Sequence, residues 1–201
     1  ATKHEVAKKF GGHSMKTILS SLLLLSSFAT FANGISLGYP AFGGNGCPQG
    51  TASAVVAPDG KSLSILFDEF MVEAEGKTTT ARKSCNIAIP VHVPNGYSVS
   101  IVDVDYRGYL SLPKGASARF TAEYFFAGTK GPAFARDWKG SLDTEYDITN
   151  KLGVQALVWS PCGADVNLRV NSAMLVRSNP KKEYTLATVD SVDVSAGLIY
   201  H

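Results

Sequence analysis

Alternation with a period of two residues, interrupted by turn sequences, runs through this chain from residue 51 onward. The clearest case is 117–127, where Phe120, Tyr124 and Phe126 alternate with polar residues such as Glu123. Successive side chains of an extended strand point to opposite faces, so one face of this strand is aromatic and belongs in a core. Outside residues 18–25, no interval shows a sustained apolar stripe at helical spacing.

The spacing of these segments predicts an all-β fold. Strands are expected at 51–57, 63–72, 85–93, 97–106, 109–113, 117–127, 142–148, 154–159, 166–176, 184–189 and 197–200. Asp59-Gly60 between two such runs is typical of a hairpin, and Pro90 inside a run favours an edge strand or a bulge. Residues 73–83 are expected to form a loop, and 69–75 could form a short helix. The pattern predicts a single antiparallel β-sandwich domain, either jelly-roll or immunoglobulin-like.

The first part of the chain has the features of a secretory signal peptide. It would start at Met15, continue through an apolar centre and end in small residues that favour cleavage after Ala32, with Gly34 the alternative. Residues 1–14 precede that start and are left out of the fold prediction. The expected domains are therefore 1–32, with the signal peptide, and 33–201, a secreted β-sandwich with no membrane span after cleavage.

Charge argues against one class of partner. The whole chain has a formal net charge of +2. Removing 1–32 takes away four lysines and one glutamate, which leaves about −1. A nearly neutral domain gives no electrostatic support for nucleic-acid binding. The expected location is extracellular or periplasmic.

The three cysteines, Cys47, Cys85 and Cys162, are far apart and lack the spacing of a zinc or redox site. In an exported protein, disulfides are the default expectation, and an odd count leaves at least one cysteine without a partner in this chain. A nucleophilic cysteine is a weaker interpretation, because His92 is almost the only internal base. No metal site and no cofactor are predicted.

The candidate binding residues lie around 103–107. Asp103 and Asp105 are two residues apart in a predicted strand, with Arg107 next on the same face. They could bind a cation or divide acid and base roles, but an ion-paired surface row is the more favoured interpretation. A second acidic row, 143–147, alternates in the same way and resembles a solvated face.

Aromatic residues offer a second kind of site. A sugar-stacking platform could be formed by Trp138, Trp159, Tyr106 and Tyr109, although such residues more often fill a core. The complete set of candidate binding residues is Asp103, Asp105, Arg107, Tyr106 and Trp159. The common catalytic motifs are absent, so no catalytic residue is assigned.

Four segments taken together resemble the DUF4360 family of small secreted proteins of unknown activity. They are Gly46-Cys47-Pro48-Gln49-Gly50, Arg82-Lys83-Ser84-Cys85, Val104-Asp105-Tyr106-Arg107-Gly108 and Leu157-Val158-Trp159-Ser160-Pro161-Cys162-Gly163. The resemblance implies secretion, a cysteine framework and a β-rich domain. Family members typically continue past the position of Tyr200-His201 to a final cysteine. On that basis Cys85 is expected to pair with Cys162, and Cys47 with a cysteine outside this sequence.

Three hypotheses about function remain open. The first, which we favour, is a non-catalytic module that binds an envelope or wall glycan or a protein partner. The second is a carboxylate-dependent glycan hydrolase that uses Asp103, Asp105 or Glu123. The third is a structural or coat component that associates through strand edges such as the Pro90 region.

Overall fold

The computed structural model describes residues 34–151 and 159–197, and all regular structure in these residues is β-strand. The strands are β1 (Ser36–Leu37), β2 (Ala41–Gly43), β3 (Ala52–Val56), β4 (Ser62–Phe67), β5 (Met71–Ala74), β6 (Thr80–His92), β7 (Ser100–Leu112), β8 (Ser117–Phe126), β9 (Ala133–Lys139), β10 (Leu142–Lys151), β11 (Val166–Arg177), β12 (Thr185–Thr188) and β13 (Ser191–Gly197). The described residues all belong to one compact unit.

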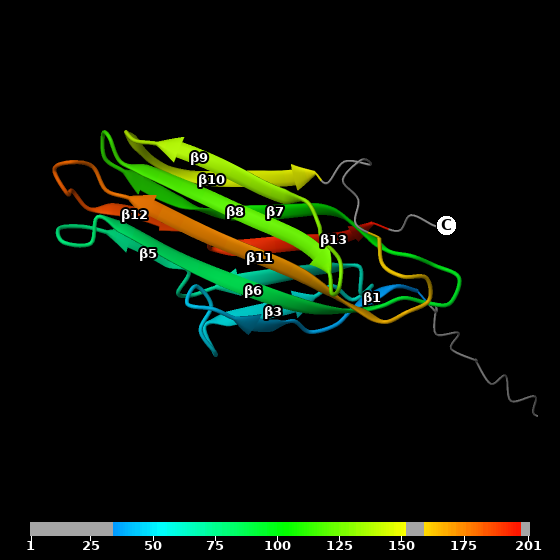
Figure 1. Cartoon of the computed structure of the whole chain (residues 1–201). Coiled ribbons are helices and arrows are strands. Elements are labelled where there is room, and N and C mark those ends of the chain that lie inside the picture. The colour runs from blue at the N-terminus through cyan, green and yellow to red at the C-terminus, as the bar shows by residue number, and fades with distance from the viewer. Residues whose placement is uncertain (1–33, 152–158, 198–201) are drawn as a thin grey trace, which may run out of the picture. The chain divides into compact units, whose positions relative to one another are not determined.

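The strands form two antiparallel sheets that pack face to face (Figure 1). The first sheet has the order β1-β6-β11-β8-β9, with β2 also paired to β6. The second has the order β3-β4-β13-β7-β12-β5, with β10 paired to β7. The main strands of the two sheets, β6-β11-β8-β9 and β4-β13-β7-β10, have the strand order of a jelly roll. The all-β sandwich is therefore confirmed, in its jelly-roll form.

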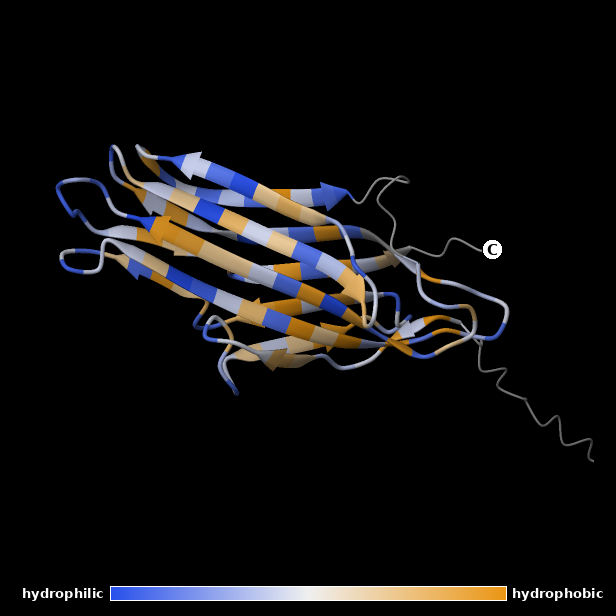
Figure 2. Ribbon diagram, viewed as in Figure 1, coloured by the Kyte–Doolittle hydropathy of each residue, from blue (hydrophilic) through white to orange (hydrophobic). Residues whose placement is uncertain are grey.

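Apolar and polar residues alternate along the main strands (Figure 2), and in β8 the buried positions alternate in the same way. In β8, Phe120, Tyr124 and Phe126 are buried, as the alternation predicts. From the other sheet, Tyr106 on β7 packs against Phe120 with ring centroids 4.6 Å apart. Packing of large apolar side chains from both sheets is the main stabilising contribution in such a fold.

Several predicted boundaries are wrong. Residues 69–75 contain strand β5 rather than a helix, and the predicted loop 73–83 shortens because β6 begins at Thr80. Gly108 does not interrupt β7, which is one strand. Strands β1, β2, β9 and β13 were missed. The predicted strands at 154–159 and 197–200 fall almost entirely outside the described residues.

The backbone carbonyl of Pro90 faces the side of β6 that is paired only by the short strands β1 and β2. Its carbonyl oxygen accepts a hydrogen bond from the Gly38 backbone N–H at 2.7 Å. The nitrogen and oxygen of one strand residue face the same side, so Pro90 cannot return a hydrogen bond to Gly38, and the ladder is interrupted between β1 and β2. β6 is thus an inner strand whose outer side is only partly covered, rather than a free edge.

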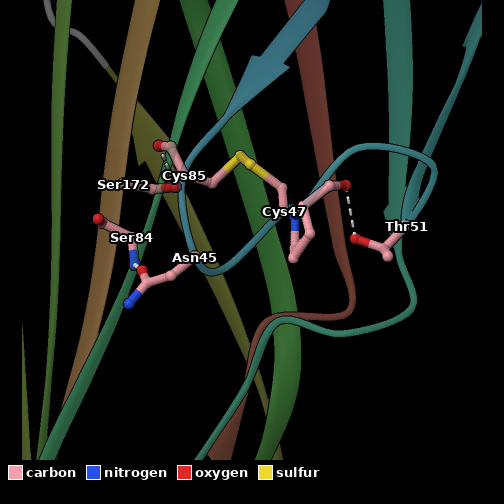
Figure 3. The surroundings of a disulfide bond; sticks show 7 residues. Asn45, Cys47, Thr51, Ser84, Cys85 and Ser172 are labelled. Atoms are coloured by element: carbon pink, nitrogen blue, oxygen red, sulfur yellow. Dashed lines mark hydrogen bonds between the residues drawn. A yellow bond between two sulfur atoms is a disulfide. The ribbon is translucent and has the colours of Figure 1, made fainter.

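The disulfide joins Cys47 to Cys85, with their Cα atoms 5.4 Å apart (Figure 3). The predicted Cys85–Cys162 pair is wrong. Cys85 is buried on the inner face of β6 opposite Ser172, in the middle of β11, whereas Cys162 precedes β11. At about 3.3 Å per residue, the six strand residues between 166 and 172 alone separate these positions by about 20 Å, beyond disulfide reach.

Local contacts explain why Cys47 reaches Cys85. The loop 44–50 passes along the side of β6 at Ser84, whose carbonyl oxygen accepts the Gly46 N–H at 2.9 Å and whose N–H donates to Asn45 Oδ1 at 2.8 Å (Figure 3). A Cβ at Gly44 would collide with the Ser84 carbonyl, so only glycine allows this approach. Cys162 is the exposed, free cysteine.

Candidate functional site

The outer face of the second sheet holds the acidic residues that the sequence singled out. Asp103, Asp105 and Arg107 share this face of β7, as predicted, because their buried neighbours Val104 and Tyr106 point into the core. Strand register places Asp193 of β13 opposite Asp105 and Asp147 of β10 opposite Arg107. Carboxylates from three strands therefore gather around one guanidinium.

Arg107 neutralises part of this acidic row. Its Nε donates to Asp147 at 3.3 Å and its Nη1 to Asp193 at 3.0 Å. The hydrogen bond to Asp147, followed by the charge of Asp193, raises the pKa of Arg107 above its ordinary value. Ser64 also donates to Asp193, at 2.6 Å. The arrangement is that of an ion-paired surface row, and among the described residues no three acidic, histidine or cysteine side chains are placed to hold a metal ion.

Tyr106 does not belong to a surface site. Its side chain is fully buried between the sheets, and this burial raises its pKa well above the ordinary value. Nearby, Tyr124 has its pKa raised to about 12, also mainly by burial, and its hydroxyl accepts the Asn150 side-chain N–H at 3.1 Å. The proposed role of Tyr106 in binding is a wrong prediction, since a strand's inner face is covered by the opposite sheet.

The other aromatic candidates are dispersed. Trp138 on β9 is half-buried against Tyr146, with ring centroids 5.0 Å apart. Trp159 is half-buried and pairs through its backbone with Ser100 at the start of β7. Tyr109 donates its hydroxyl to Asp143 on the outer face of the second sheet. These residues do not form one stacking platform, and a role for Trp159 alone stays a prediction.

His92 lies at the end of β6, where its Nδ1 is 2.7 Å from Asp165 Oδ1. Both side chains are more than half exposed. A histidine beside a carboxylate has the arrangement of two of the three members of a catalytic triad. However, no contact in the described part of the chain joins Cys162 to His92, and the interaction of His92 with Asp165 is that of an exposed pair.

A different surface, the outer face of the first sheet, is hollowed. The hollow has a volume of about 490 Å³ and extends across β6, β11, β8 and β9. Two rows of cross-strand neighbours form it: Ser84, Ala173, Thr121 and Ala135 in one, and Asn86, Asn171, Glu123 and Ala133 in the next. We call this hollow, together with Arg82 and Arg119 at one end, the groove.

Side-chain size explains why the sheet is concave here. Ala173, Ala135 and Thr121 are short and lie at the centre of the groove, while Arg82 and Arg119 at one end project further. The polar groups are varied: guanidiniums donate only, a carboxylate accepts only, and the Asn86 and Asn171 amides do both. Arg119 is paired with Asp137, at 3.4 Å, so the excess positive charge of the groove is small.

Few features of the sequence point to this groove. Glu123 was a candidate only as a hydrolase acid, and Arg82 appeared only within a family segment. Asn86 and Asn171 were not singled out. Each looks like an ordinary exposed strand position, and their proximity depends on the pairing of β6 with β11, which are separated by 85 residues at this point.

The carboxylates proposed for a hydrolase are divided between the two faces. Glu123 lines the groove on the first sheet, whereas Asp103 and Asp105 lie on the outer face of the second sheet. A glycosidase requires two carboxyl groups on either side of one scissile bond. Glu123 therefore cannot be paired with Asp103 or Asp105.

The chain belongs to the DUF4360 family, a domain of unknown function, whose family model matches residues 33–201. It is also 34% identical over 163 residues to an uncharacterized secreted protein of the fungus Arthroderma benhamiae. That match covers 80% of this chain and 66% of the relative, so the chain spans about two thirds of the relative's length. The resemblance drawn from the four sequence segments is confirmed.

Among solved structures, the chain has a distant likeness to two carbohydrate-binding modules. One is TmCBM61 in complex with β-1,4-galactotriose, at 10% identity and a TM-score of 0.30, covering 83% of this chain and 91% of that one. The other is the family 11 module from Clostridium thermocellum in complex with a mixed-linked tetrasaccharide. It has 11% identity and a TM-score of 0.25, and the match covers 88% of this chain and 96% of that one. Neither likeness is close enough to say anything of this chain's ligand. Separately, no helix in the described residues is long and apolar enough to span a membrane.

Proposed function

We propose that this protein is an exported, disulfide-stabilised binding module that holds a neutral glycan in the groove of its first sheet. The observation that carries the proposal is the groove itself: a hollow with amides, hydroxyls and charged groups around a floor of small side chains. Export is supported by the sequence of residues 15–32, by the disulfide and by the name of the fungal relative.

The chemistry of the groove suits a sugar chain. Sugar hydroxyls both donate and accept hydrogen bonds, so they match the amides of Asn86 and Asn171 and the hydroxyl of Thr121. The volume falls within the range of about 300–1,000 Å³ that is typical of ligand sites. The alanines of the floor can contact the C–H faces of sugar rings.

Charge favours a neutral ligand over a polyelectrolyte. Arg82 and Arg119 are balanced by Glu123 within the groove and by Asp137 beside it. A polyanion would be attracted by the arginines and repelled by the carboxylates. A polycation would be attracted by the carboxylates and repelled by the arginines. A neutral polysaccharide of a wall or envelope meets no such conflict.

The test is glycan-array screening followed by calorimetry on the glycans that bind. Asn171→Ala should weaken binding about three- to tenfold, because it removes hydrogen bonds between neutral groups. Asn167→Ala is the matched control, since Asn167 lies on the same face of β11 but outside the groove. Ala135→Trp should abolish binding by filling the hollow while leaving the fold intact.

Three outcomes would contradict the proposal. The first is no glycan binding at all. The second is binding that is unchanged by Asn171→Ala and Ala135→Trp but lost in Asp103→Asn or Asp105→Asn, which would move the site to the acidic row. The third is release of reducing sugar that Glu123→Gln or Asp105→Asn abolishes, which would favour the hydrolase.

A further inference from the structure

Strand β3 forms an edge of the second sheet, and its outer side is open. It pairs with β4 alone. The Asp68 N–H donates to the Thr51 oxygen, and the Ala57 N–H donates to the Ser62 oxygen, both at 2.9 Å. Odd-numbered residues of β3 therefore direct their backbone groups toward β4, and the even-numbered residues Ala52, Ala54 and Val56 direct theirs away from it. In the part of the chain that the structure describes, no hydrogen bond satisfies these outward groups.

This edge lacks the features that normally prevent strand edges from pairing. Proteins protect edges with charges, prolines, bulges or very short strands. The open edge strands β5, β9 and β10 each carry at least one charged residue, and β1 and β2 have only two and three residues. β3 reads Ala-Ser-Ala-Val-Val, with neither charge nor proline.

The side chains beside this edge are apolar and exposed. Val55 is 66% exposed on the outer face of β3, and Leu66 on the neighbouring strand is 54% exposed. On the inner face, Ala52, Ala54 and Val56 are only partly buried against the core, since the sandwich ends there. An additional strand placed against β3 would cover side chains on both faces.

We propose that β3 pairs antiparallel with β3 of a second copy of this chain, joining two second sheets into one continuous sheet. The strand is self-complementary about Ala54. With Ala54 opposite Ala54 of the second copy, Ala52 meets Val56 at either end. All three of these outward residues then fall at hydrogen-bonded positions of the ladder. This register forms an isologous two-fold contact, the commonest symmetry of soluble oligomers.

A second copy fits this edge because β3 is self-complementary and because its pairing with itself carries no charge penalty. A neutral strand meets no like-charge repulsion when it pairs with itself, whereas β10, with Asp143, Glu145 and Asp147, would be repelled by its own copy. The contact is short, so the dimer should be weak. It would double the number of groove sites on one particle, and two linked sites bind a polymeric ligand more tightly than one.

Sedimentation and light scattering over a concentration series test the pairing. The protein should change reversibly from monomer to dimer as its concentration rises. Val55→Lys introduces charges diagonally across the junction and should raise the dissociation constant at least tenfold. Ala54→Pro should do the same by removing the two central N–H donors, and it spares the β4 ladder because the Ala54 N–H faces away. Met71→Lys, an exposed change on the edge strand β5, is the control and should leave the dimer intact.

Amide exchange supplies a second measurement. The N–H groups of Ala52, Ala54 and Val56 should exchange quickly in dilute protein and more slowly in concentrated protein, while that of Val55 stays protected throughout. A protein that remains monomeric at about millimolar concentration would overturn the proposal. So would a dimer that both β3 variants leave unchanged. Thermal unfolding of each variant shows whether it is folded, and this proposal does not depend on glycan binding.

Discussion

The two outer faces of the sandwich have the same strand geometry but opposite surfaces. On the first sheet, short side chains at the centre leave the groove, with polar groups around it. On the second sheet, the centre is filled by Arg107 and the carboxylates that it binds. The hollow that we propose as a binding surface therefore results from short side chains at the centre of one face, whereas charged side chains fill the centre of the other.

The difference also concerns how the polar groups are used. Arg107 donates to Asp147 and Asp193, whereas within the described residues the side-chain amides of Asn86 and Asn171 form no hydrogen bond with each other. Polar groups that already bind one another contribute less to ligand affinity, because the ligand must first replace their existing partners. Changes to the core, which both faces share, test this contrast first. Substitutions on each sheet then test the two faces separately.

The largest effect should come from alkaline pH, which acts on the core that both faces share. Burial raises the pKa of Tyr106, Tyr124 and Tyr146, and that of Tyr124 reaches about 12. An unfolded chain loses these protons near pH 10, so above that pH the unfolded state binds fewer protons than the folded state. Stability is therefore complete below about pH 10 and falls as pH rises further, by up to about 1.4 kcal/mol per pH unit for each tyrosine.

Urea unfolding between about pH 9 and pH 12, with phenolate absorbance, measures this loss. We expect exposed tyrosines to ionise first and the buried three to ionise together with unfolding. Groove binding and the structure of the acidic row should disappear in the same transition. If the buried tyrosines ionised near pH 10 in a folded protein, the tight shared core would be disproved.

Removal of the disulfide should have the next largest effect, and it should affect the first face more directly. Cys47 and Cys85 close a loop with a sequence separation of 38, worth about 4 kcal/mol in the chain-entropy model. Cys47→Ala with Cys85→Ala should lower the free energy of unfolding by about that amount. The loop 44–50 would then be held beside Ser84, at the groove, by hydrogen bonds alone.

Chemical denaturation with and without glycan checks this expectation. Cys162→Ser is the control, since Cys162 is exposed and free, and it should change stability by no more than about 0.5 kcal/mol. If Cys162→Ser were as destabilising as loss of Cys47, the pairing of Cys47 with Cys85 would be wrong.

The sequence predicted the faces of the strands but could not predict the groove. Alternation in 117–127 correctly placed Phe120 and Tyr124 inside, because it is a property of one strand. The acidic row was visible for the same reason, since Asp103, Asp105 and Arg107 follow one another along β7. The groove depends on four strands meeting side by side, and no local pattern records which strands pair.

Long-range pairing also explains the wrong disulfide. The position of Cys85 on an inner face follows from the alternation of β6, but the path of loop 44–50 over that strand does not. The resemblance to a family implied a cysteine framework without fixing its connectivity. Tyr106 was misplaced for a simpler reason: the two faces of a strand are equivalent in sequence until one of them is known to be covered.

A moderate effect is expected from Gly108→Ala on β7. Gly108 lies on the inner face directly opposite Tyr146, and an added Cβ would come within 2.6 Å of the Tyr146 hydroxyl oxygen and would also meet the Thr188 backbone. The Tyr146 hydroxyl donates to the Thr188 oxygen at 2.6 Å, so neither group can move freely. Overpacking of this kind should destabilise the protein by about 1–3 kcal/mol.

A double-mutant cycle with Tyr146→Phe identifies the cause. Loss of the hydroxyl relieves part of the clash, so the double variant should be more stable than the sum of the single effects predicts. Groove affinity should be unchanged in the folded protein, because Gly108 belongs to the second sheet. Strict additivity would show that the two positions do not compete for space.

The smallest effect on stability should come from Arg107→Gln, and its comparison with Arg119→Gln separates the two faces most directly. Both arginines are exposed and paired with aspartate, Arg107 with Asp147 and Asp193, and Arg119 with Asp137. Exposed ion pairs contribute little to stability, and salt screens them. Arg107→Gln should therefore cause a small loss of stability that is detectable mainly at low ionic strength, where Asp105 and Asp193 repel each other across the strands.

Glycan affinity should be unchanged by Arg107→Gln but weakened by Arg119→Gln, because only Arg119 lines the groove. Equal loss of affinity in both variants would mean that charge in general, rather than the shape of one face, determines binding.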